Sequence, residues 1–179
     1  MKKILFILIV LTLSACNISN TPSSVVEKYL NNYKNISDEV IDDLEITLSN
    51  EDLSNVNREN YKKALLRVYE NLSYEILDES INGDKAEVQV HIKVIDLYKE
   101  EKESNDYMLN NVSEFYNASQ EFDNDLYNTY RIEKMQKALD KIDYNIIFKV
   151  NKKEGVWILE EPNRDVIEKL NGLYNYDYK

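Results

Sequence analysis

The sequence predicts a single domain of the α+β class, and two patterns of apolar residues support this prediction. In some segments apolar residues recur every three or four positions, which is typical of helices packed on one side. In two other segments they alternate with polar residues around a turn sequence, which is typical of antiparallel hairpins. The helices and hairpins occupy separate runs of the chain, so the expected class is α+β. A chain of 179 residues is long enough to bury a core.

Three helices are expected before the first hairpin. Thr21 and Pro22 are residue types favoured at a helix start. Ser37 is expected to cap a second helix and Asn57 a third. Each helix has an apolar stripe at helical spacing: Val25, Val26, Tyr29, Leu30 and Tyr33 in the first, Val40, Ile41, Leu44 and Leu48 in the second, and Tyr61, Ala64, Leu65 and Val68 in the third.

The first hairpin contains the clearest strand of the sequence. It turns at Asn82-Gly83-Asp84, after a strand that includes Tyr74 and Ile76. One face of the following strand is apolar and the other polar, so the sheet should have one core face and one exposed face. The apolar face comprises Ala86, Val88, Val90, Ile92 and Val94, and the polar face Lys85, Glu87, Gln89, His91 and Lys93.

One long helix and a second hairpin complete the predicted domain. The helix runs from Ser104 to about Lys141 and should be kinked or broken, because an unbroken helix of that length would span roughly 55 Å. The second hairpin covers residues 142–159, with its turn at 152–155. A short helix over 165–170, capped by Asn163, should end near Gly172.

The first 16 residues resemble a bacterial lipoprotein signal. Lys2 and Lys3 precede an apolar run of about 10 residues, which is too short to span a bilayer. Leu13-Ser14-Ala15-Cys16 then resembles a lipobox, in which the Cys16 thiol takes a diacylglycerol and cleavage removes the residues before it. The alternatives are an ordinary secretory signal with a chance cysteine, or a structural cysteine.

These expectations divide the chain into four parts: a signal peptide (1–15), the lipidated Cys16 with a short tether (16–21), the folded domain (22–174) and a tail (175–179). The mature protein would be held on the extracytoplasmic face of the cell membrane through the lipid on Cys16, and two acyl chains give stable anchoring.

Several short motifs resemble one family. They are Tyr74-Glu75-Ile76, the hairpin from Ile81 to Val90, the strand Gly155-Val156-Trp157-Ile158-Leu159, and the closing Asn171-Gly172-Leu173. In this order they resemble small lipoproteins of low-G+C Gram-positive bacteria with an NTF2-like, cystatin-like domain of unknown function. The resemblance covers about residues 22–174. It implies a cone in which a curved sheet wraps the helices around a cavity, and it implies no fixed activity.

Charge and composition exclude several classes of function. The net charge is −11, and removing Lys2 and Lys3 with the signal makes it −13. We therefore expect no nucleic-acid partner, since phosphate binding needs clustered Lys and Arg. A single Cys and a single His leave few ligands for a metal or cofactor and no nucleophile with a base, so no metal, cofactor or catalytic site is expected.

The remaining candidate residues are expected to have structural roles. His91 falls on the exposed face of its strand, without the partner that a general base needs. Asp123-Asn124-Asp125 lacks the glycine and distal Glu of a calcium loop. Asp42-Asp43-Glu45 and Glu160-Glu161 are expected to be solvated. The other candidates are aromatic. Phe115, Phe122 and Tyr130 are expected to pack in the core, with lining of a cavity as the alternative. Packing of the tail is the expected role of Tyr174, Tyr176 and Tyr178.

The leading functional expectation is therefore a membrane-anchored binding or interaction module. Its ligand would be a small apolar molecule or an envelope protein. One alternative is an NTF2-like enzyme that uses a carboxylate and a Tyr pair buried in the cone. Another is that the signal peptide itself, from Leu8 to Ala15, is released as an apolar pheromone.

Overall fold

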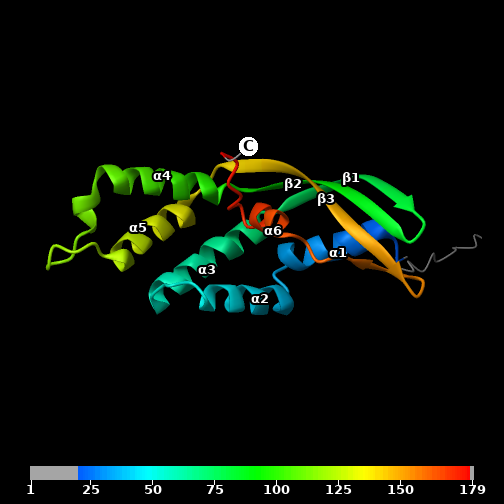
Figure 1. Ribbon diagram of the computed structural model, residues 1–179, viewed down its shortest axis with the longest axis horizontal. Coiled ribbons are helices and arrows are strands. Elements are labelled where there is room, and N and C mark those ends of the chain that lie inside the picture. The colour runs from blue at the N-terminus through cyan, green and yellow to red at the C-terminus, as the bar shows by residue number, and fades with distance from the viewer. Residues whose placement is uncertain (1–19, 178–179) are drawn as a thin grey trace, which may run out of the picture.

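A four-stranded antiparallel sheet forms one layer of the molecule, and helices cover one of its faces (Figure 1). The computed structural model describes residues 20–177, so the predicted signal peptide and the lipid site at Cys16 lie outside the described residues. In chain order the elements are α1 (Pro22–Lys34), α2 (Asp38–Ser49), α3 (Asn55–Glu70), β1 (Ser73–Asn82), β2 (Lys85–Ile95), α4 (Leu97–Asn110), the 3-10 helix η1 (Val112–Phe115), α5 (Asn124–Lys137), β3 (Lys141–Lys153), β4 (Val156–Leu159) and α6 (Arg164–Leu170). The α+β class is confirmed.

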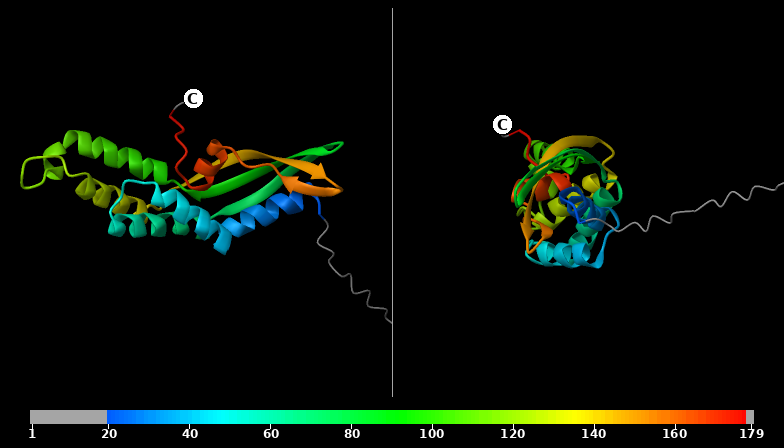
Figure 2. Two further views of the ribbon diagram at one scale, coloured as in Figure 1. Left: turned by 60° about the horizontal axis from the view of Figure 1, so that its bottom comes forward. Right: turned by 90° about the vertical axis from the view of Figure 1, so that its right-hand side faces the viewer.

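The two hairpins pair into one sheet with the strand order β1-β2-β3-β4. Val90 of the central strand β2 lies between Ile76 of β1 and Ile146 of β3. Val88, Val90 and Ile92 are fully buried, whereas Glu87 and Gln89 are exposed. The alternation in the sequence therefore assigned the two faces correctly. The sheet curves over the helix layer (Figure 2).

The three N-terminal helices form as predicted, except for the start of α3. Ser54, and not Asn57, is the cap, since its hydroxyl accepts a hydrogen bond from the Asn57 N–H at 3.4 Å. Asn57 is buried inside the first turn, where its amide donates to Asp125 Oδ1 at 2.8 Å and accepts from Thr129 at 3.1 Å. Its side chain joins α3 to α5, so tertiary bonding overrides its capping preference.

The segment between the hairpins is helical and broken, as its length predicted, but the break makes it a helical hairpin and not a kinked helix from Ser104 to Lys141. Asp96 caps α4, which therefore begins seven residues earlier than predicted. At the other end the Asn111 side chain bonds the Tyr107 carbonyl at 2.9 Å. Asp123 then accepts from the N–H groups of Asp125 and Leu126 and starts α5. Short polar side chains that compete for backbone groups thus break the helix.

Candidate functional site

A groove with a cavity volume of about 930 Å³ lies between α2 and α3 on one side and α6 with the C-terminal tail on the other. Its floor is apolar and is built from the facing stripes of the two helices. Leu44 and Leu48 come from α2 and Leu65 from α3, and all three are buried. The Arg58 guanidinium joins the start of α3 to the end of α2 by donating to the carbonyls of Leu48 and Leu53. At the C-terminal end of α2 this cation also complements the helix dipole.

Four tyrosines form the walls of this groove: Tyr33, Tyr61, Tyr69 and Tyr98. Tyr33 and Tyr69 meet edge to face with ring centroids 5.1 Å apart, and the Tyr69 hydroxyl donates to Asn171 Oδ1 at 2.8 Å. Burial raises the pKa of Tyr33, Tyr61 and Tyr69 above the ordinary value. The phenols therefore stay neutral around pH 7 and add no negative charge.

The rim of the groove is strongly acidic. Five carboxylates line it, those of Asp43, Glu51, Glu101, Glu161 and Glu168, against the single guanidinium of Arg164. Arg164 pairs with Glu168 at 2.5 Å, and Arg131 pairs with Glu101 at 2.6 Å. Asp43, Glu51 and Glu161 form no ion pair with any residue between 20 and 177. The groove thus has excess negative potential at its mouth and an apolar interior.

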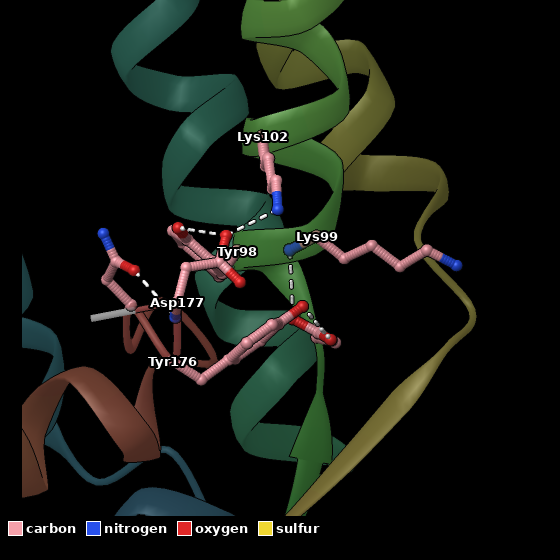
Figure 3. A network of polar contacts seen from close by, with 7 residues as sticks. Tyr98, Lys99, Lys102, Tyr176 and Asp177 are labelled. Atoms are coloured by element: carbon pink, nitrogen blue, oxygen red, sulfur yellow. Dashed lines mark hydrogen bonds and ion pairs between the residues drawn. The ribbon is translucent and has the colours of Figure 1, made fainter. Parts of the chain in front are cut away.

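The C-terminal tail forms one wall of the groove and is fastened to the start of α4 (Figure 3). The Tyr176 ring packs edge to face on Tyr98 at 4.8 Å, and its hydroxyl donates to Asp96 Oδ2 at 3.2 Å. The Asp177 carboxylate accepts from Lys102 Nζ at 2.5 Å and from the Tyr98 hydroxyl at 3.3 Å. Residues 175–177, the described part of the predicted tail 175–179, therefore contact the domain.

An exposed ion pair adds to the contacts of this tail at neutral pH. The hydrogen bond from Lys102 lowers the pKa of Asp177, and the same contact raises the pKa of Lys102. Burial, followed by the Asp96 charge, raises the pKa of Tyr176 to about 12. Because the Asp177 pKa is depressed in the folded state, its contribution is present above the ordinary Asp value and is lost as the pH falls through the depressed value. The ion pair should thus form at neutral pH and be lost in acid, with a small effect on the tail because both side chains are largely exposed.

A second groove of about 770 Å³ lies between α1 and the edge strand β4. The Asn20 side chain pairs with the Trp157 backbone there, accepting from its N–H at 2.5 Å and donating to its carbonyl at 3.1 Å. This pairing already occupies the backbone N–H and carbonyl of Trp157, which a ligand in the second groove could otherwise bind. The first groove is therefore the better candidate.

The acidic and histidine candidates occupy structural positions. His91 lies on the exposed face of the sheet as predicted, but the expectation that it lacks a partner is wrong, since Asp143 lies 3.2 Å and Asn145 3.0 Å away on the neighbouring strand. Asp123 caps α5, whereas it was predicted to lie inside a helix. Asp43 and Glu161 are exposed, as expected for solvated charges, and both also lie on the groove rim. Within residues 20–177 no three His, Cys, Asp or Glu side chains gather in a way that could hold a metal ion.

The aromatic candidates separate into two groups. Phe122 and Tyr130 both pack on Phe115 at the end of the α4–α5 hairpin, and none of the three lines the groove. In the tail, Tyr174 packs on Tyr144 and Tyr176 on Tyr98, as predicted for one or two rings, while Tyr178 lies outside the described residues.

Sequence reasoning missed Asp96, whose carboxylate is buried beside a tyrosine. An Asp directly after a strand is a common helix-start signal, but the predicted helix began too late for this signal to be recognised. Asp96 and Tyr176 are the nearest match to the carboxylate and Tyr pair of the enzymatic alternative. Neither of them lines the groove, and their bonds serve the helix cap and the tail.

No helix between residues 20 and 177 is long and apolar enough to cross a membrane. No protein-family model and no curated protein matches the sequence. Among solved structures, a candidate lipoprotein from Bacillus subtilis strain 168, ycdA, matches with a TM-score of 0.44 and 16% sequence identity. The match covers 84% of this chain and 47% of that one, so the chain spans about half the length of that protein.

Proposed function

We propose that the protein is a lipid-anchored binding module on the extracytoplasmic face of the cell membrane, and that its groove holds a small organic cation with an apolar body. The observation that carries this proposal is the make-up of the groove between α2, α3 and α6. An apolar floor, tyrosine walls and an acidic rim occur together in a cavity of about 930 Å³, a volume in the range of small-molecule sites.

Each part of the groove favours a different part of such a ligand. The floor at Leu44, Leu48 and Leu65 would remove apolar surface of the ligand from water. Neutral tyrosine rings attract cations through the negative face of the ring. The unpaired carboxylates of Asp43 and Glu161 add Coulomb attraction at the mouth, and they would repel an anion.

The anchor rests on the lipobox Leu13-Ser14-Ala15-Cys16. The folded domain begins close behind it, since Asn20 already bonds the edge strand and α1 starts at Pro22. A tether of so few residues reaches less than ~20 Å, so the domain would stay near the membrane. Its acidic character would keep it off anionic headgroups.

The same proposal places the chain among the small lipoproteins of low-G+C Gram-positive bacteria with an NTF2-like, cystatin-like domain. The order of N-terminal helices, two hairpins in one curved sheet and a short last helix supports this placement. The divided helical segment between the hairpins departs from the long, kinked or broken helix that the apolar pattern predicted there.

Titration calorimetry of the full chain with benzyltrimethylammonium tests the groove, because this probe combines an apolar ring with a permanent cation. We expect binding of the cation and none of benzylsulfonate, its anionic counterpart. Asp43→Asn should weaken binding about threefold to tenfold, as loss of one partly exposed charge contact does. The matched control is Asp42→Asn, which removes the same charge from an exposed neighbour outside the groove. Equal weakening by both variants, or equal binding of neutral benzyl alcohol, would contradict the proposal.

Cys16→Ala tests the anchor separately. Without the thiol the diacylglycerol has no attachment atom, so we expect an unprocessed or shed protein instead of a mature membrane species. Membrane fractionation with an immunoblot for size measures this outcome. Mature-sized Cys16→Ala protein that remained in the membrane fraction would show that Cys16 is not the anchor.

A further inference from the structure

Several apolar side chains are exposed at the end of the α4–α5 hairpin, where the chain passes from α4 through η1 into α5. Leu109 is 71% exposed and Val112 is 41% exposed. Single exposed apolar residues are ordinary, but a group of them at one site marks an interaction surface. We call this group the hairpin tip, and its members are Tyr107, Leu109, Val112, Tyr116, Phe122 and Leu126.

Packing and hydrogen bonds hold the tip in one shape. Phe115 is buried at its centre, with the Tyr127 and Tyr130 rings each 5.5 Å away. The connecting loop is closed by a bridge between Tyr116 and Phe122 and by the Asp123 N–H, which donates to the Phe115 carbonyl at 2.7 Å. Exposed rings on a preorganised support lose little entropy on binding, which is typical of interface anchors.

The charge around the tip has one sign. Residues 103–130 contain six acidic side chains and no Lys, Arg or His. Among them, Glu114 accepts a hydrogen bond from the Tyr107 hydroxyl at 2.8 Å, and Asp123 caps α5. An apolar patch surrounded by carboxylates complements an apolar patch surrounded by Lys and Arg.

The tip also lies far from the start of the domain. The α4–α5 hairpin projects beyond the sheet at one end of the molecule, whereas α1 begins at the opposite end, beside the two β-hairpin turns (Figures 1 and 2). If the N-terminus is the anchored end, the tip faces away from the membrane. An acidic surface would in addition be repelled by anionic lipid.

We propose that the hairpin tip docks a partner protein through a surface that has an apolar centre and a basic rim. The rings and Leu109 enter the apolar centre, and the surrounding carboxylates pair with the rim. This interface is separate from the groove, so it does not depend on the organic-cation proposal, and ligand binding in the groove should be unaffected by substitutions at the tip.

Hydrogen exchange on the full chain tests this proposal, with a synthetic amphipathic helix of Leu and Lys as the probe. The chain is held on phosphatidylcholine vesicles, and binding of the probe to bare vesicles is subtracted. We expect the probe to protect backbone amides of residues 107–126, and a Leu and Glu helix of the same length to protect none. Added salt should weaken the protection, since the rim contacts are charged.

A matched pair of double variants separates binding at the tip from nonspecific binding to exposed apolar side chains. Leu109→Ser with Val112→Ser should weaken binding of the Leu and Lys helix at least tenfold. Ile81→Ser with Ile147→Ser removes apolar side chains of 54% and 53% exposure from the sheet, away from the tip, and should change it less than twofold. Equal losses in the two variants would overturn the proposal. So would protection of 107–126 by phosphatidylglycerol vesicles or by higher protein concentration alone, because these would identify a lipid or a second copy as the occupant.

Discussion

Gly172→Ala is expected to destabilise the protein by roughly 3 kcal/mol or more, an unusually large effect for one added methyl group. Gly172 ends α6 with φ +67°, a conformation that costs a residue with a side chain about 1 kcal/mol. A Cβ at this position would lie 2.0 Å from the Ile95 carbonyl oxygen, so the backbone would have to move. That movement would also break the hydrogen bond from the Tyr98 N–H to the Gly172 carbonyl, 2.8 Å long, which contributes about 1 kcal/mol.

Gly155→Ala is the matched control. Gly155 also has positive φ, +84°, but a Cβ there would meet nothing within 4 Å. This variant should therefore lose only the conformational term of about 1 kcal/mol. Equilibrium urea unfolding followed by circular dichroism compares the two. Similar losses would show that the close approach between Gly172 and Ile95 relaxes without cost, and that the tail is not tightly seated against α4.

The hairpins of the sheet could be predicted from the sequence because the alternation of apolar and polar residues is a local pattern with only two possible faces. Residues such as Val90 and Gln89 alternate between two faces, and a shift of one residue would exchange the faces completely. The turns at Gly83 and Gly155 both have positive φ, as glycine-containing hairpin turns require. These two constraints fix the pairing within each hairpin, whereas the pairing of β2 with β3 is a long-range contact that they do not fix.

The helical hairpin could not be predicted from the apolar pattern. Phe115 and Phe122 are seven residues apart, a spacing that also fits one face of a continuous helix. In the folded protein the same two rings meet across a turn, 6.4 Å apart. The information that breaks the helix lies in the side chains of Asn111 and Asp123, which bond nearby backbone groups. Their weak helix preference is a matter of tenths of a kcal/mol and is easily overlooked beside a strong apolar pattern.

The groove could be predicted only in its parts. Tyr33 and Leu44 were assigned to apolar stripes, and stripes normally face the core. Which members of a stripe remain at a cavity depends on how far α2 and α3 are held from α6. Tertiary contacts set that distance, for example the hydrogen bond from Tyr69 of α3 to Asn171 at the end of α6. Asp43 gave no signal of its own, because an acidic residue on a polar face has the same pattern whether or not a groove lies beside it.

Val90→Asp is the second substitution with a large expected effect, a loss of roughly 4 kcal/mol or more. Val90 is fully buried at the middle of the central strand, between Ile76 and Ile146, and the buried residues between 20 and 177 include no Lys, Arg or His that could pair with a carboxylate. The buried carboxyl would favour its protonated form, so its pKa should rise and the deficit should shrink as the pH falls.

The exposed neighbour Gln89 provides the control for this substitution. Gln89→Asp places the same charge on the opposite face of β2, where it should change the free energy of unfolding by no more than about 0.5 kcal/mol. If Val90→Asp does not fold, Val90→Ala still tests the burial, with an expected loss of about 2 kcal/mol from the missing methyl groups and the cavity. Urea unfolding at neutral and acidic pH measures all three. A loss from Gln89→Asp as large as that from the Val90 variants would mean that the outer face of the sheet is covered as well, as it would be by a second copy of the chain.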